Sequence, residues 1–133
     1  MPPRTLLPDD ASDAAILAAV DRWAALLEDE EYEAAFNATE HDPAMRWTPE
    51  LMRDVIKQYG DAEPGQKVTL DGRPTDITQQ KSVHRFPKNK HGFVGHVWYD
   101  LNINAVASDL TATFGLRADS GGLVFVLDDI HVM

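Results

Sequence analysis

Three histidines are the side chains whose type and placement could bind a metal ion. His84, His96 and His131 each fall in a segment with strand-like alternation, and imidazole suits zinc, copper, iron and nickel. The three rings could meet on one ion if their strands were neighbours. His96 and Asp100 are four residues apart and therefore share one face of a strand. The chain has no HxH or HExxH spacing, so the sequence favours surface or hydrogen-bonded histidines and predicts no metal site.

Two adjacent carboxylates near the C-terminus are the next feature that could do chemistry. Asp128 and Asp129 interrupt the apolar segment LVFVLDDIHV. Neighbouring residues of a strand face opposite sides, so both carboxylates could act on one atom only if a β-bulge turned them together. The pattern favours a strand end or a bulge with one carboxylate in solvent.

Several chemistries are excluded by what the sequence lacks. The chain has no cysteine, which excludes disulfides, zinc–thiolate sites, iron–sulfur clusters and cysteine nucleophiles. No serine stands in a GxSxG motif, so the hydrolase elbow is absent. The glycine pairs lie in hairpin-like surroundings and not in strand-to-helix turns, so no nucleotide cradle is predicted. We expect no cofactor.

The charge of the chain limits the classes of partner that it could bind. The 133 residues carry a formal net charge of −10, which disfavours binding to nucleic acid phosphates and to anionic membranes. No apolar run approaches the length of about 18 residues that spans a membrane, and the N-terminus lacks a secretory signal. These features predict a cytoplasmic protein.

Two charged runs stand out against this background. The acidic run Glu28 to Glu33 is a solvated helix face or, alternatively, a surface for a basic protein partner. The basic loop RFPKNKH, with Lys88 and Lys90, is a solvated hairpin tip or a contact loop for an acidic partner or a second subunit.

The first half of the chain predicts helices. Apolar residues recur at intervals of three and four in 11–30, the pattern of an amphipathic helix, and the helical face continues through 32–36. Residues 37–47 are expected to form a loop. Thr48 as N-cap with Pro49 in the first turn predicts a further helix that ends at Gly60.

The second half alternates with a period of two residues. We expect strands at 68–70 and 75–86 joined by a hairpin at Asp71-Gly72, then strands over 93–103, 109–116 and 123–132, with a turn at Ser120 to Gly122. In the third strand the two predicted faces are Phe93, Val97, Tyr99, Leu101 and Ile103, against Val94, His96, Trp98, Asp100 and Asn102. Helices followed by an antiparallel meander of four to five strands make one α+β domain over 1–133.

The last strand is apolar on both faces. Leu123, Phe125 and Leu127 point one way, and the other way point Val124, Val126, Ile130 and Val132. Such a strand must be covered on both faces, while the helices can cover only one. Sheet curvature, a long loop or another subunit could cover the outer face. We predict a homodimer or protein-partner surface there, with His96, Trp98, Lys88 and Lys90 as interface residues.

The order of these elements resembles the nuclear transport factor 2-like (cystatin-like) superfamily. The resemblance rests on a long first helix with a tryptophan, the EYEAAF continuation, a second helix and a closing strand of the form GLVFVLDDIHV. It implies a curved sheet wrapped around the helices and a cone-shaped pocket between them. The side chains expected to line or fill that cone are Trp23, Phe36, Tyr99, Phe114 and Phe125.

The resemblance leaves function open, because members of this superfamily include isomerases, cyclases, adaptors and immunity proteins. Our first hypothesis is a non-catalytic protein-binding module of immunity type, with a possible basic partner. The alternative is an enzyme of the ketosteroid isomerase or polyketide cyclase type, in which Tyr99 or Asp129 would be the polar group of the cone pocket.

Overall fold

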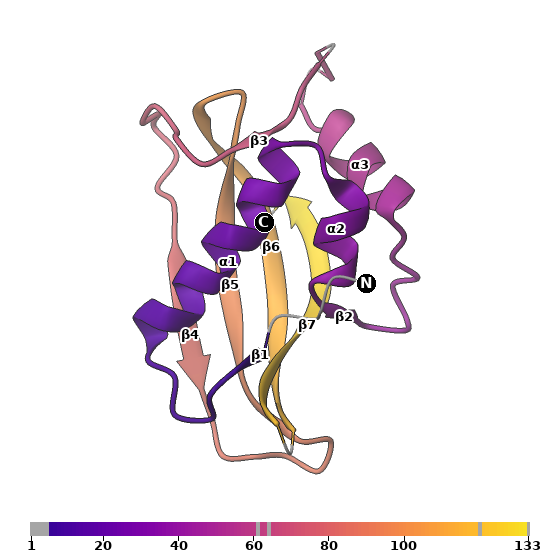
Figure 1. Cartoon of the computed structure of the whole chain (residues 1–133). Helices are drawn as coiled ribbons and strands as arrows, with labels where there is room; N and C mark the ends of the chain where they lie inside the picture. Colours follow the sequence, from indigo (N-terminus) through magenta and orange to yellow (C-terminus); the bar gives the residue numbers. More distant parts are fainter. Residues whose placement is uncertain (1–5, 61, 64, 120, 133) are drawn as a thin grey trace.

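Three helices lie against a curled, mostly antiparallel sheet in the computed structural model, which describes residues 6–60, 62–63, 65–119 and 121–132 (Figure 1). The helices among these residues are α1 (Asp13–Glu28), α2 (Tyr32–Asn37) and α3 (Pro49–Lys57). The strands described are β1 (Leu6–Leu7), β2 (Glu40–His41), β3 (Val68–Thr69), β4 (Lys81–Arg85), β5 (Phe93–Ile103), β6 (Val106–Asp119) and β7 (Gly122–Val132). The predicted α+β class is confirmed, in the form of a half-barrel.

The long strands β5, β6 and β7 form the predicted meander. Their neighbours in the sheet follow the order β1-β7-β6-β5-β3, and β4 also pairs with β5. The short strands β1 and β2 both pair with β7, β2 in the parallel direction. Residues 37–47 were expected to form a loop, so β2 corrects that prediction. A two-residue strand has no alternation that a sequence could reveal.

The helix ends follow local signals in the sequence. The Ser12 hydroxyl accepts a hydrogen bond from Ala15 N at 3.1 Å at the start of α1. Thr48 caps α3 in the same way through Leu51 N, with Pro49 as the first helical residue, as predicted. The predicted turn at Ser120 to Gly122 lies partly outside the described residues, although Asp119 pairs with Gly122 at the ends of β6 and β7.

The predicted hairpin at Asp71-Gly72 is wrong. β3 and β4 do not pair with each other, because each pairs with a different stretch of β5. Gly72 instead lies against β5, where an added Cβ would come within 2.3 Å of the Asn102 side chain. Asn102 Nδ2 donates to Leu70 O at 2.8 Å and holds this segment on the sheet. The predicted strand over 75–86 is therefore reduced to β4.

A bulge at the start of β5 corrects the predicted faces of that strand. Phe93 pairs with Arg117 while Gly95 pairs with Leu116, so the register shifts between them. Val94 consequently packs against the core, and Phe93 lies over Gly115 on the outer face. The predicted inward position of Phe93 is wrong because strict alternation ignores the inserted residue.

A bulge in β7 confirms that one of the two adjacent carboxylates lies in solvent, and it corrects the predicted position of Ile130. Thr113 pairs with Asp129 and Phe114 with Leu127, which leaves Asp128 as the inserted residue, exposed to solvent. Trp47 Nε1 donates to Asp128 O at 3.0 Å and satisfies a carbonyl at the bulge. Because the register shifts there, Ile130 joins the core and not the outer face to which alternation assigned it.

Candidate functional site

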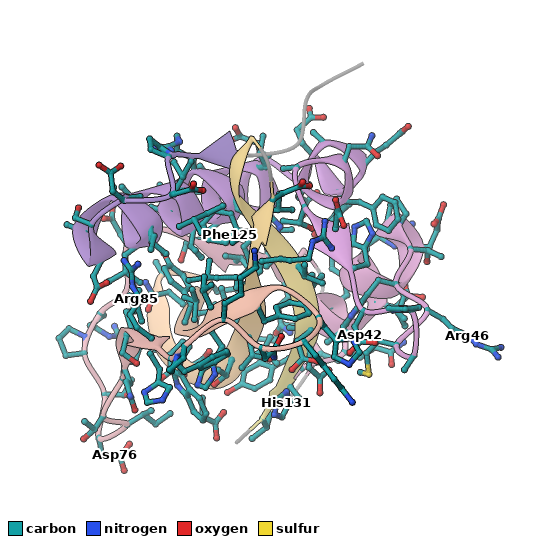
Figure 2. The ribbon with its side chains drawn as sticks, turned by 90° about the horizontal axis from the view of Figure 1, so that it is seen from below. Asp42, Arg46, Asp76, Arg85, Phe125 and His131 are labelled. Carbon is teal, nitrogen blue, oxygen red and sulfur yellow. The ribbon has the colours of Figure 1, made fainter. Side chains whose placement is uncertain are left out.

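Aromatic side chains fill the space between the helices and the sheet. Trp23, Tyr99, Phe114 and Phe125 are each at most 3% exposed. The Trp23 and Phe114 rings meet edge to face with centroids 4.9 Å apart, and Phe114 contacts Phe125 in a similar geometry at 6.0 Å. In the view from below, Phe125 lies directly beneath the helices (Figure 2). The place of the expected cone pocket is occupied by packed side chains.

An open groove of about 770 Å³ lies on the opposite, outer face of the sheet. It crosses β5, β6 and β7 and ends at the segment after β2. In Figure 2 the outer face is the lower side, where the side chain of His131 lies. The groove is lined by His41, Asp42, Pro43, His91, Phe93, His96, Trp98, Thr113, Phe114, Gly115, Arg117, Val126 and Asp128.

The small residues Thr113 and Gly115 of β6 line this groove together with larger side chains of β6 and of the neighbouring elements. Phe93 lies so close to Gly115 that an added Cβ would be 2.5 Å from its ring. Thr113 Oγ1 donates to Asp128 Oδ2 at 3.2 Å. A volume of this size, lined by aromatic side chains and by polar groups, is within the range of ligand-binding sites in proteins.

The predicted interface residues lie at or beside this groove. His96 and Trp98 line it directly. Lys88 and Lys90 are exposed in the loop that also contributes His91 to the lining. The sequence missed the contribution of Phe93, of Arg117 and of residues 41–43, which only the bulge and the short β2 strand bring to this face.

His84 and His96 lie side by side in the structure, and His131 lies apart from them. His84 pairs with His96 across β4 and β5, and their rings stack with centroids 5.0 Å apart. His131 is on β7, with β6 in between, and its Nδ1 lies 2.9 Å from Asp129 Oδ2. Within the described part of the chain, no group of three or more histidine, aspartate or glutamate side chains could hold a metal ion.

Tyr99 and Asp129, the two candidate catalytic residues, lie on opposite faces of the sheet. The Tyr99 hydroxyl donates to Asp21 Oδ1 on the helix side, while Asp129 pairs with Thr113, whose side chain faces the groove. Burial and the neighbouring Asp21 carboxylate raise the pKa of Tyr99, which makes its phenol a poorer proton donor near neutral pH. The two groups cannot act together on one substrate.

Asp100 is a buried carboxylate that sequence reasoning assigned only to the mixed face. Its Oδ1 accepts hydrogen bonds from Trp98 Nε1 at 2.9 Å and Thr111 Oγ1 at 2.6 Å. Its Oδ2 accepts from Gln80 N at 2.7 Å. These bonds tie the segment before β4 to the outer face of β5 and β6.

Two carboxylates of the acidic run at the end of α1 bind groups of the same chain. Glu30 Oε1 lies 2.5 Å from Lys57 Nζ, and this bond lowers the pKa of Glu30. Glu28 Oε2 accepts from Leu70 N at 3.2 Å. Asp29 and Glu31 remain as exposed carboxylates beside them.

Fold and site together define an α+β half-barrel domain with a packed interior and an open groove on its outer sheet face. The chain belongs to the family described as "Domain of unknown function (DUF7668)", whose model matches residues 24–133. Comparisons with curated proteins and with solved structures found no match. No helix among the described residues is long and apolar enough to cross a membrane.

Proposed function

We propose that this domain is a non-catalytic protein-binding module of the nuclear transport factor 2-like fold, and that its outer groove is the binding surface. The observation that carries the proposal is the contrast between the two sides of the sheet. The helix side is filled by Trp23, Phe114 and Phe125, whereas the outer side has an open groove of about 770 Å³.

The groove has the composition of a protein-recognition surface. Aromatic residues and arginine are enriched at such surfaces, and Phe93, Trp98 and Arg117 line this one. The packed interior also supports protein binding over the alternative, an enzyme that uses the cone pocket, because a substrate would have to displace core side chains.

Capture of partners from an extract of the native cell, with matched variants, tests this function. We expect Trp98→Ser and His96→Glu to lose a protein that the wild type retains, because both side chains line the groove. His96 is exposed, so its substitution leaves the core intact. Leu51→Ser, at an exposed position on α3, is the control and should retain the partner. Equal retention by all four proteins would contradict the proposal.

A second copy of the chain is the other form that protein binding could take. An outer-face homodimer would cover Trp98 and Val126. Sedimentation equilibrium of the wild type and of His96→Glu tests it, because a groove that binds a second copy would give dimer mass for the wild type alone. Monomer mass for both proteins would leave a different protein as the partner.

The acidic surface supports a second candidate, an immunity-type protein that binds a basic partner. Asp29 and Glu31 are exposed and two residues apart, just after the end of α1. They belong to a chain of net charge −10, and such a charge attracts cationic proteins over long range. We expect Asp29→Asn with Glu31→Gln to slow the association of a basic partner and to weaken its salt dependence, as measured by surface plasmon resonance. An unchanged association rate would rule this surface out.

A further inference from the structure

Four of the five histidines of the chain gather at the outer groove. His41, His91 and His96 line it, and His84 stacks on His96. His41 is oriented by its own contacts, because its ring stacks on Phe36 at 3.9 Å and its Nε2 bonds Phe36 O at 2.7 Å. Histidine is the side chain whose charge ordinarily changes between about pH 5 and 8.

The other charged groups around these imidazoles come from every neighbouring element. The loop after β4 contributes Lys88 and Lys90, and β6 contributes Arg117, whose Nη2 lies 2.6 Å from Glu40 Oε1 of β2. Besides Glu40, four carboxylates lie among these groups. Asp119 Oδ2 is 3.9 Å from Arg117 Nη2, Asp129 pairs with Thr113 on the groove face, and Asp42 and Asp128 line the groove. Asp42 Oδ1 accepts from Ala44 N at 2.9 Å, and Asp128 Oδ2 accepts from Thr113. Three cations and five carboxylates give these groups a formal net charge of −2 while the imidazoles are neutral, and the net charge rises above zero when all four imidazoles are protonated.

We propose that the groove binds an acidic segment of a partner protein, and that it binds this segment more tightly as the pH falls. The inference rests on the proposed function and names the chemistry of the partner. Apolar side chains of the segment lie on Phe93 and Trp98, and its carboxylates face the imidazoles of His84, His91 and His96. Glutamate ordinarily titrates near pH 4.3, so these carboxylates stay charged while the imidazoles gain a proton.

Charge complementarity favours this occupant over a second copy of the chain. A two-fold symmetric contact places the same surface patch on both sides. Protonated imidazoles would then face protonated imidazoles, together with Lys88 and Lys90 of each copy, and like charges across an interface repel. An acidic segment supplies the opposite charge.

The test measures the binding of a fluorescent pool of peptides of about eight residues, in which glutamate alternates with leucine or tryptophan. Such a peptide is long enough to follow β5 from Phe93 to Trp98 at about 3.3 Å per residue. Fluorescence anisotropy is read at about pH 7.5 and pH 5.5, on either side of the usual imidazole titration. We expect the wild-type affinity to rise about tenfold at the lower pH, equivalent to about 1.4 kcal/mol.

Matched variants show which histidines cause the gain in peptide affinity at the lower pH. The double substitution His84→Gln and His96→Gln should remove most of the pH-dependent gain, because both rings are exposed at the groove. His131→Gln is the control on the same face, where the ring pairs with Asp129 outside the groove lining, and it should keep the gain. Circular dichroism verifies that each variant is folded. An equal loss in the control and the double variant would overturn the proposal.

Two further outcomes separate this inference from the proposed function. A pool with lysine in place of glutamate should bind more weakly at the lower pH, and tighter binding of that pool would overturn the inference. Binding of a partner that depends on Trp98 but not on pH would also overturn the inference while leaving the proposed function standing. Self-association at the lower pH that excludes the acidic peptides would assign the groove to a second copy.

Discussion

Asp100 shows how one side chain can hold an irregular part of the sheet together. Its carboxylate accepts hydrogen bonds from Trp98, Thr111 and the Gln80 backbone, and it is only 6% exposed. A buried charge of this kind is tolerated when its hydrogen-bonding capacity is satisfied. Asp100 therefore fixes the Trp98 ring, which is one wall of the groove.

Replacing this carboxylate tests that role. Asp100→Asn should lower the free energy of unfolding by about 1–3 kcal/mol, because the amide NH₂ group would face donors that have lost their acceptor. Urea unfolding measures the change. Asp128→Asn is the control, since Asp128 is exposed and accepts one bond from Thr113, and it should cost less than about 0.5 kcal/mol. Equal losses in the two variants would show that burial of Asp100 contributes nothing.

The tyrosines predict how stability changes at alkaline pH. Burial is the main cause that raises the pKa of Tyr99, of Tyr59 and of Tyr32, and the carboxylates of Asp21 and Asp109 add to it at the first two. A raised pKa means that the folded state holds the phenol proton more tightly than the unfolded state does. The stabilising contribution is complete below about pH 10, where unfolded tyrosine titrates, and is lost as the pH rises further.

Tyr99→Phe isolates one of these contributions. The wild type should lose about 1 kcal/mol more than the variant between about pH 9 and pH 11, because one unit of pKa difference corresponds to about 1.4 kcal/mol. Urea unfolding at both pH values measures the difference. Parallel losses in the two proteins would mean that Tyr99 ionises equally in the folded and unfolded states.

At the scale of the elements, glycines permit the close approaches that shape the groove. An added Cβ at Gly95 would lie 2.6 Å from the backbone oxygen of His84, and one at Gly115 would lie 2.5 Å from the Phe93 ring. Backbone cannot move aside as easily as a side chain can. The two positions therefore have different roles, although both are glycines in neighbouring strands.

Replacing each of these glycines by alanine distinguishes an effect on strand pairing from an effect on the shape of the groove. Gly95→Ala should lower the free energy of unfolding by about 1–3 kcal/mol, because β4 must shift away from β5. Gly115→Ala should destabilise less and should change the fluorescence of a probe bound in the groove, because Phe93 must rotate. Thermal unfolding and probe titration measure the two effects. A larger destabilisation by Gly115→Ala would contradict this assignment.

Local signals in the sequence predicted the elements better than their pairing. The cap at Thr48, the first turn at Pro49 and the long alternating strands depend on neighbouring residues, and the structure has them as predicted. The bulges at Val94 and Asp128 could not be located, because an inserted residue is defined by its partner strand.

The same limit applies to the candidate site. His96 and Trp98 alternate in a long strand, so their shared face was predictable. Arg117 and residues 41–43 reach the groove through pairings between distant parts of the chain. No local pattern encodes such pairings, and the predicted hairpin at Asp71-Gly72 failed for that reason, since Gly72 approaches Asn102 and not its sequence neighbours.

At the scale of the whole molecule, the sheet separates a packed side from a binding side. α1 lies across one face, where Trp23 and Leu27 are buried. The other face has a groove lined by aromatic side chains together with three of the histidines, and a fourth histidine, His84, stacks on His96. A molecule of net charge −10 thus gathers most of its histidines at the side proposed to bind a partner.

The most direct test of this account is nuclear magnetic resonance mapping of the ¹⁵N-labelled protein while it binds the acidic peptides or a captured partner. We expect the amide signals of His96, Trp98, Gly115 and Val126 to shift, and those of α1 to stay in place. Shifts concentrated at Trp23, Tyr99 and Phe125, which do not line the groove, would instead place the ligand between the helices and the sheet and would contradict the central claim.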